Sequence, residues 1–260
     1  MLGIYVFQYI QLRTVEQKSS EAIESAQREI NQVKEQAQKD IADEKRTVQT
    51  LIKKSEDKPS TSDIVSKWDP IVAYIVCEFK YTDGSVYQVQ SGSGTLVIDS
   101  NGHRSVLTNE HVVDDGSGYR PSECAIKFPD DPTTMSVTYS DIMTSSSGSD
   151  EATILLANPD SYTKNLTAAG RHYCSAEPDI GDQIVILGYP GIGSPTGITA
   201  TEGIVSGFDG DYYVTSAKVE HGNSGGAAIS VKNNCYLGIP TYVETGQAES
   251  LARILKWQAF

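Results

Sequence analysis

Ser224 lies in the segment of this sequence that most clearly suggests chemistry, the glycine-rich stretch 220–226. A serine hydroxyl becomes a strong nucleophile only when a base removes its proton and nearby donors stabilise the oxyanion that forms. Glycine at positions 222, 225 and 226 allows a tight turn, in which the N–H groups of Gly222 and Ser224 point into one small hole with Asn223 between them. A glycine-rich hairpin turn would have the same composition, so a catalytic interpretation needs partners elsewhere in the chain.

His111 is the candidate base. It follows the apolar run 105–107, where the end of a buried strand would place it beside a cleft. Of the other histidines, His103 and His172 lie in polar loop sequence, and His221 is expected to be an exposed neighbour of the cleft that contacts substrate. A lone histidine at a strand end is commonly structural, so this interpretation depends on its pairing with Ser224.

Asp150 is the candidate for the carboxylate that must orient the imidazole and stabilise its charged form. It opens the apolar segment 151–156, so its side chain can face inward at the mouth of a strand. Two other acids compete. Asp141 lies in a Ser-rich loop, and Glu151 points to the opposite side of an extended chain.

The net charge of −13 is unevenly distributed over the 260 residues. Residues 1–58 hold ten basic and ten acidic side chains, and the remaining 11 basic and 24 acidic residues account for the whole excess. An acidic globular part repels phosphate backbones, so nucleic acid is not expected as a partner. Nothing in the sequence calls for a metal or an organic cofactor.

The N-terminal region 1–58 is expected to be one long helix, because residues 15–54 contain no Pro or Gly. Its aliphatic residues recur at steps of three and four with one extra step, which favours a short coiled coil, and with it a homo-oligomer, over a helix that lies on its own globular domain. A solvated single helix that acts as a stalk is the alternative. The apolar opening 1–12 is too short to span a bilayer. It is either the end of a longer membrane anchor or an apolar end that packs on a partner helix. The stripe consists of Ile23, Ala26, Ile30, Val33, Ala37, Ile41, Val48 and Leu51.

After a Pro- and Ser-rich linker expected over 59–66, the texture changes to short runs rich in Val, Ile, Thr and Tyr, separated by turn residues. Many closely spaced strands with few helices between them predict antiparallel barrels or sandwiches. A polar stretch over 158–178 could join two lobes.

The four cysteines are far apart in the sequence and form no C-x-x-C pair, so a zinc or thioredoxin-type site is not indicated. If each lobe closes its own disulfide, Cys77 pairs with Cys124 and Cys174 with Cys235. Buried free thiols are the alternative.

Taken together, these motifs resemble the trypsin-like peptidases, most closely the bacterial HtrA (DegP/DegS-like) branch without its PDZ domain. The order is His, Asp, Ser. The matching stretches are T-x-x-H-V at 108–112, the acid before an apolar strand at 150, G-N-S-G-G at 222–226, G-S-G-T at 92–95, G-Y-P at 188–190 and E-G-I-V-S at 202–206.

This resemblance implies a mainly β fold, with two six-stranded antiparallel β-barrels over about 67–160 and 178–260. His111 and Asp150 would come from the first barrel and Ser224 from the second. The oxyanion hole would be the loop of Gly222, Asn223 and Ser224.

The resemblance also implies a substrate side-chain pocket with Gly238, Ile239 and Pro240 in one wall. Lys218, six residues before Ser224, falls where the pocket floor is expected. If its ammonium reaches the pocket, an acidic substrate side chain would be preferred. The preferred alternative is that Lys218 extends into solvent.

The sequence therefore predicts a serine endopeptidase that cuts polypeptides outside the cytoplasm, in the periplasm or cell envelope, with the N-terminus as a membrane tether. The competing hypothesis is a catalytically silent, coiled-coil-anchored module that binds peptides in the same cleft.

Overall fold

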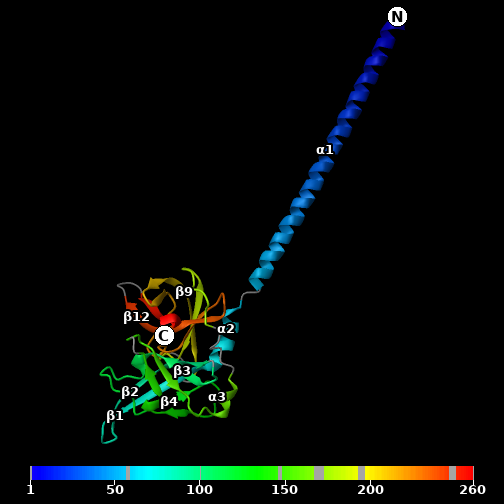
Figure 1. Ribbon diagram of the computed structural model, residues 1–260. Coiled ribbons are helices and arrows are strands. Elements are labelled where there is room, and N and C mark those ends of the chain that lie inside the picture. Colours follow the sequence, from blue (N-terminus) through cyan, green and yellow to red (C-terminus); the bar gives the residue numbers. More distant parts are fainter. Residues whose placement is uncertain are drawn as a thin grey trace. The chain divides into compact units, whose positions relative to one another are not determined.

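The computed structural model of the protein describes residues 2–56, 59–99, 101–145, 148–166, 173–192, 197–245 and 250–259. The chain divides into two compact units, Met1–Lys58 and Pro59–Phe260. The first unit is one helix, α1 (Leu2–Glu56), as its composition predicts (Figure 1). No helix in the described part of the chain is both long and apolar enough to cross a membrane.

The second unit begins with helix α2 (Thr61–Trp68), where the sequence suggested a linker over 59–66. The side chain of Ser60 accepts a hydrogen bond from the backbone N–H of Asp63, and the Asp63 carboxylate accepts one from the N–H of Ser60. This reciprocal capping satisfies donors that the first helical turn leaves free. Ile64 and Trp68 are fully buried one turn apart, so a segment that reads as polar in fact packs on the core.

The first lobe is a seven-stranded antiparallel sheet with the order β5-β4-β1-β2-β3-β7-β6. The closed six-stranded barrel predicted here is therefore incorrect. The edge strands β5 and β6 are only three residues long and are joined by a 3-10 turn, and among the described residues each pairs only with its inner neighbour. The strands are β1 (Val72–Lys80), β2 (Val86–Ile98), β3 (Arg104–Thr108), β4 (Glu123–Lys127), β5 (Met135–Val137), β6 (Ile142–Thr144) and β7 (Ala152–Leu155), and helix α3 (Ser161–Asn165) follows.

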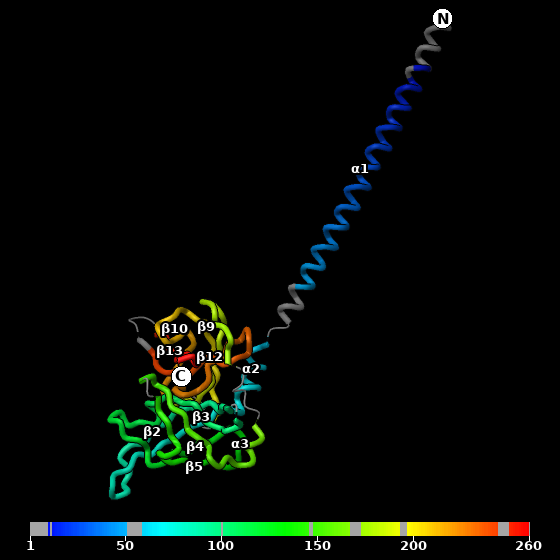
Figure 2. Tube along the Cα trace, in the orientation of Figure 1, coloured from blue at the N-terminus to red at the C-terminus, as the bar shows by residue number. Residues whose placement is uncertain are grey.

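The second lobe is a closed six-stranded barrel with the order β10-β13-β12-β11-β8-β9, as predicted (Figures 1 and 2). Its strands are β8 (Gln183–Gly188), β9 (Thr199–Asp209), β10 (Tyr212–Thr215), β11 (Ala227–Ser230), β12 (Cys235–Thr245) and β13 (Ser250–Lys256).

One hydrophobic cluster spans both lobes. It joins side chains of the first sheet, such as Ile75 and Val106, to residues of the barrel, such as Leu187 and Ile239. Burial of aliphatic side chains on both sides of the junction stabilises the lobes as one body. A site assembled from the two lobes is therefore held rigidly.

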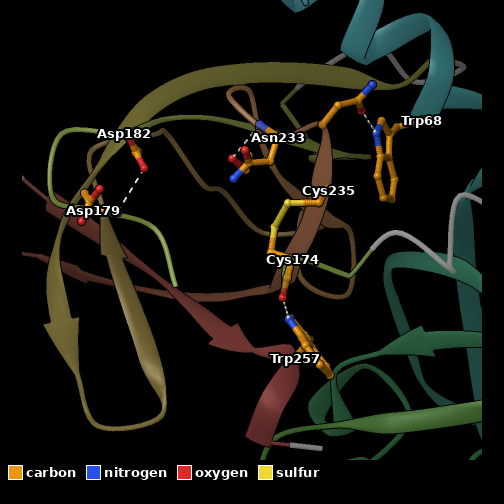
Figure 3. The surroundings of a disulfide bond; sticks show 9 residues. Trp68, Cys174, Asp179, Asp182, Asn233, Cys235 and Trp257 are labelled. Carbon is orange, nitrogen blue, oxygen red and sulfur yellow. Dashed lines mark hydrogen bonds between the residues drawn. A yellow bond between two sulfur atoms is a disulfide. The ribbon is translucent and has the colours of Figure 1, made fainter. Parts of the chain in front are cut away.

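Each lobe contains one disulfide, Cys77–Cys124 and Cys174–Cys235, which is the pairing expected if each lobe closes its own. In Figure 3, the second disulfide lies between the rings of Trp68 and Trp257. The Trp257 Nε1–H donates to the carbonyl of Cys174 at 3.2 Å. Trp68 stacks on Tyr236 and donates its Nε1–H to Asn234 Oδ1 at 2.8 Å, so α2 is tied to the barrel.

Candidate active site

His111 and Asp150 are joined by two hydrogen bonds. His111 lies in a single 3-10 turn (Glu110–Val112) directly after β3, and Asp150 lies two residues before β7, the neighbour of β3. The backbone N–H of His111 donates to Asp150 Oδ1 at 3.0 Å, and its ring Nδ1 is 2.7 Å from Oδ2. With both oxygens engaged, the carboxylate fixes the ring orientation and directs Nε2 away from itself.

The two competing acids are occupied elsewhere. The Asp141 carboxylate caps its own 3-10 turn by accepting from the N–H and hydroxyl of Thr138. Glu151 accepts from the hydroxyl of Thr153, and burial raises the pKa of its carboxyl. Asp150 is thus the acid that the structure brings to His111.

Ser224 lies three residues before β11. Its hydroxyl donates to the carbonyl of Thr241 in β12 at 3.0 Å. Its carbonyl accepts from the backbone N–H of Ser93 at 2.8 Å. Among the described residues there is no hydrogen bond between this hydroxyl and the His111 ring. In this resting state the nucleophile candidate is therefore held by the barrel.

The contacts around Gly92 nevertheless bring the two halves of the site together. A Cβ on Gly92 would lie 2.7 Å from Val112 Cγ2 and 3.1 Å from the Ser224 carbonyl oxygen, so the neighbours of His111 and Ser224 itself meet across this glycine. The Asn109 side chain adds a second link, since its Nδ2 donates to the carbonyl of Asp150 at 2.7 Å and to Thr241 Oγ1 at 3.1 Å.

The turn 220–223 sets the direction of the predicted oxyanion donors. The N–H of Asn223 donates to the carbonyl of Glu220 at 2.9 Å, and Gly222 has φ +101. Positive φ at the third residue is the mark of a type II turn, which glycine adopts most easily. The carbonyl of His221 accepts from the N–H of Gly191. Because N–H and C=O of a trans peptide point in opposite directions, the Gly222 N–H is directed away from Gly191.

Ser93 in β2 connects the two lobes at this turn. Its side chain is fully buried, and its hydroxyl donates to the carbonyl of Gly222 at 2.6 Å while accepting from the N–H of Tyr189 at 2.8 Å. Its own carbonyl accepts from the hydroxyl of Thr108 at 2.7 Å. A Cβ on Gly225 would lie 2.0 Å from that carbonyl oxygen, so glycine is required there for the close approach.

A cavity of about 350 Å³ opens beside the oxyanion turn. Its described lining includes Asn223 and Lys218, but not the three predicted wall residues. Gly238, Ile239 and Pro240 are buried in β12, where the Pro240 carbonyl accepts from the N–H of Gly225. His221 is exposed, as is Lys218. The lining consists of Pro190, Ile192, Thr199, Thr201, Ser216, Ala217, Lys218, Val219, Glu220, Asn223, Val243, Ser250 and Ala252.

A second cavity, of about 430 Å³, adjoins His111. Besides His111 and Asp150, its lining includes Glu110, Asp114 and Asp115, so it is strongly acidic. Within the described ranges, no three His, Cys, Asp or Glu side chains form a group that could hold a metal ion. We call this space the acidic cavity.

Sequence reasoning did not assign roles to Ser93, Asn109, Thr108 and Thr241, which hold the turn and the acid in place. A role for Ser93 could have been predicted, because it lies between two glycines in the 92–95 motif. Thr241 gave no signal, since its contact with Asn109 joins residues 132 positions apart.

Comparisons with known proteins identify the family and the fold of the chain. Residues 92–239 match the trypsin-like peptidase domain. The serine protease Do-like HtrA of Bacillus subtilis is 27% identical in an alignment of 201 residues that covers 68% of this chain and 41% of that protein. The chain thus spans well under half the length of that relative. The structure of the serine endoprotease from Yersinia pestis aligns with a TM-score of 0.57 and 22% identity, over 77% of this chain and 64% of that one, and shows the shared fold.

Proposed function

The chain belongs to the trypsin-like peptidase family, and on that basis we propose that it is a serine endopeptidase with Ser224 as nucleophile, His111 as base and Asp150 as the orienting acid. The observation that carries the proposal is the pair of hydrogen bonds from His111 to the two oxygens of Asp150. That pairing leaves Nε2 as the ring nitrogen available to take up a proton.

In the proposed reaction, Ser224 Oγ attacks the scissile carbonyl carbon while its proton passes to His111 Nε2. The carbonyl electrons move onto oxygen, where the N–H groups of Gly222 and Ser224 stabilise the charge. His111 then protonates the leaving amine and the C–N bond breaks, which leaves an acyl-serine. A water molecule, deprotonated by His111, hydrolyses the ester and restores Ser224.

The resting hydrogen bond from Ser224 to Thr241 requires one adjustment. Rotation of the serine side chain about χ1 would exchange the carbonyl of Thr241 for His111 Nε2. One hydrogen bond replaces another, so the net cost is expected to be about 1 kcal/mol or less.

The test is turnover of an unfolded protein substrate by matched variants. Ser224→Ala is expected to lower the rate by about 10⁶-fold. His111→Ala should be similarly impaired, whereas the control His103→Ala, which removes an exposed histidine just before β3, should retain activity. Parent-like cleavage by folded Ser224→Ala would exclude this serine as the nucleophile.

A catalytically silent peptide-binding module is the second candidate, favoured by the hydrogen bond that holds Ser224 on Thr241. Such a module would bind a peptide in the cleft with equal affinity in the parent and in Ser224→Ala, and neither would release product. The turnover assay separates the two functions.

Membership of the family implies polypeptide substrates. We assign the substrate side-chain pocket to the cavity beside Asn223, whose hydroxyl-bearing and apolar lining would accept a medium-sized side chain. The two disulfides indicate an extracytoplasmic protein, and we place its activity in the cell envelope.

A further inference from the structure

Helix α1 carries a stripe of exposed aliphatic side chains. Each residue of an α-helix is rotated by about 100° from the one before, so the seven residues of the stripe fall within an arc of about 80°. Their exposed fractions run from 48% to 69%. We call this surface the α1 stripe. It consists of Leu12, Val15, Ile23, Ile30, Val33, Ile41 and Val48.

The α1 stripe is straight. Its spacing alternates between 11 and 7 residues from Leu12 through Ile23, Ile30 and Ile41 to Val48. One 11-residue step and one 7-residue step together make 18 residues, which are about five full turns at 3.6 residues per turn, so the stripe returns to the same side of the helix. A strict seven-residue repeat would instead wind slowly around the helix axis. The stripe therefore runs along one side of the helix for about 54 Å. A partner must offer an apolar line of the same length and straightness, which a second copy of α1 does.

Charges on the two sides of the stripe select the orientation. By helical rotation, Glu29 and Asp40 flank one side of the middle of the stripe and Lys34 and Lys45 flank the other, where Glu16 also lies toward the N-terminal end. Two parallel helices in register bring the acidic flank of each against the basic flank of the other, with partners five residues apart. An antiparallel pair brings acid against acid and base against base.

Other features of α1 are consistent with a close approach along this stripe. Ala26 and Ala37 lie on the stripe, and their small side chains allow a second helix to approach closely. The intrahelical ion pairs Arg28–Glu24, at 3.6 Å, and Arg46–Asp43, at 3.7 Å, use charges that point away from it. They leave the four flanking charges for a partner.

We propose that two copies of this chain associate through their α1 helices, parallel and in register, along the α1 stripe. Glu44 is the weak point, because it also lies on the stripe and would face its own copy. Like charges across a helix pair destabilise it. The proposal does not depend on peptidase activity.

The main test is sedimentation velocity of the full chain in a Ser224→Ala background, which prevents self-digestion. The parent should sediment at twice the mass of the 28.2 kDa chain. Glu29→Lys with Asp40→Lys makes both flanks basic and should weaken association by more than about tenfold. Adding Lys34→Glu and Lys45→Glu exchanges the four flanking charges of residues 29–45 and should restore the dimer. Circular dichroism checks that each variant keeps its helix.

Orientation is tested by cross-linking. Ser19 lies on the stripe line, so Ser19→Cys should form a disulfide between copies under mild oxidation only if the helices are parallel. If they are antiparallel, Ser19→Cys would cross-link to Glu44→Cys in a mixture and not to itself. Glu44→Leu should tighten the parallel dimer. A helical parent that stays monomeric, a trimer, or a double-lysine variant that dimerises like the parent would overturn the proposal.

Discussion

Removal of the Ser93 hydroxyl is expected to impair the oxyanion hole without changing any residue of the triad. In Ser93→Ala the carbonyl of Gly222 and the N–H of Tyr189 both lose the partner they have at 2.6 and 2.8 Å. The turn that carries the Gly222 N–H then keeps two backbone hydrogen bonds, from the N–H of Gly191 to the His221 carbonyl and from the N–H of Asn223 to the Glu220 carbonyl. Loss of a whole oxyanion donor costs about 10²–10³ in kcat. Because these two hydrogen bonds remain, we expect a smaller decrease in kcat, of about 10- to 100-fold.

The assay compares steady-state kinetics with the binding of a peptide boronate, whose tetrahedral oxygen would occupy the oxyanion hole. Ser93→Ala should lower kcat and weaken boronate binding by similar factors, while KM stays within about threefold of the parent, because the lost interaction is made in the transition state. The matched control is Ser91→Ala, which removes an exposed hydroxyl from the same strand and should be neutral.

Stability must be measured alongside, since the carbonyl of the buried Gly222 and the N–H of the half-buried Tyr189 both lose a partner. Each unpaired group costs about 1–3 kcal/mol, so urea unfolding should show a clear decrease for Ser93→Ala and none for Ser91→Ala. A purely structural role would lower stability and leave kcat of the folded fraction intact. That result, or boronate affinity equal to the parent's, would refute the positioning of Gly222 by Ser93.

Three further predictions concern substrate choice and pH. Lys218 is exposed and shares its cavity with Glu220, so Lys218→Ala should change kcat/KM for peptides with Glu before the scissile bond by less than about threefold. A tenfold loss would show that the ammonium reaches the substrate. The acidic cavity adjoins His111, the proposed proton donor to the leaving amine, so peptides with Lys just after the scissile bond should be cleaved about fivefold faster than those with Glu at low salt, and the difference should shrink at high salt. Equal rates at low salt would contradict this. Burial raises the pKa of the Glu151 carboxyl above its value in the unfolded chain. As the pH rises above the pKa of the unfolded chain, ionisation of this carboxyl therefore lowers the free energy of unfolding. Glu151→Gln should stabilise the protein against urea at neutral pH and lose that advantage once acid protonates the carboxyl in both states. An equal gain in stability for Glu151→Gln at neutral and at acid pH would contradict the destabilising effect of the ionised carboxylate.

Residues close in sequence gave the local parts of the site reliably. Gly222 needs positive φ beside Ser224, and such a requirement is visible in the residue types themselves. The choice of Asp150 over Glu151 followed from strand alternation, and the structure brings Asp150 to His111.

What the sequence could not give depends on distant pairing. The closure of a sheet depends on which edge strands meet, and β5 and β6 are too short for their pattern to reveal it. The helix α2 was missed because its Ser- and Asp-rich start resembles a loop, although the same residues form a capping box. The predicted pocket wall of Gly238, Ile239 and Pro240 stays a prediction, because these residues are buried in β12 and do not line the described cavity beside Asn223.

The most direct test of the proposed activation of Ser224 by His111 is the site of covalent labelling by a fluorophosphonate, identified by mass spectrometry of the digested protein. The oxygen of an activated hydroxyl bonds to phosphorus as fluoride leaves, so we expect one labelled residue, Ser224, and loss of labelling in His111→Ala. Labelling confined to another serine, or a folded parent protein that stays unlabelled, would contradict it.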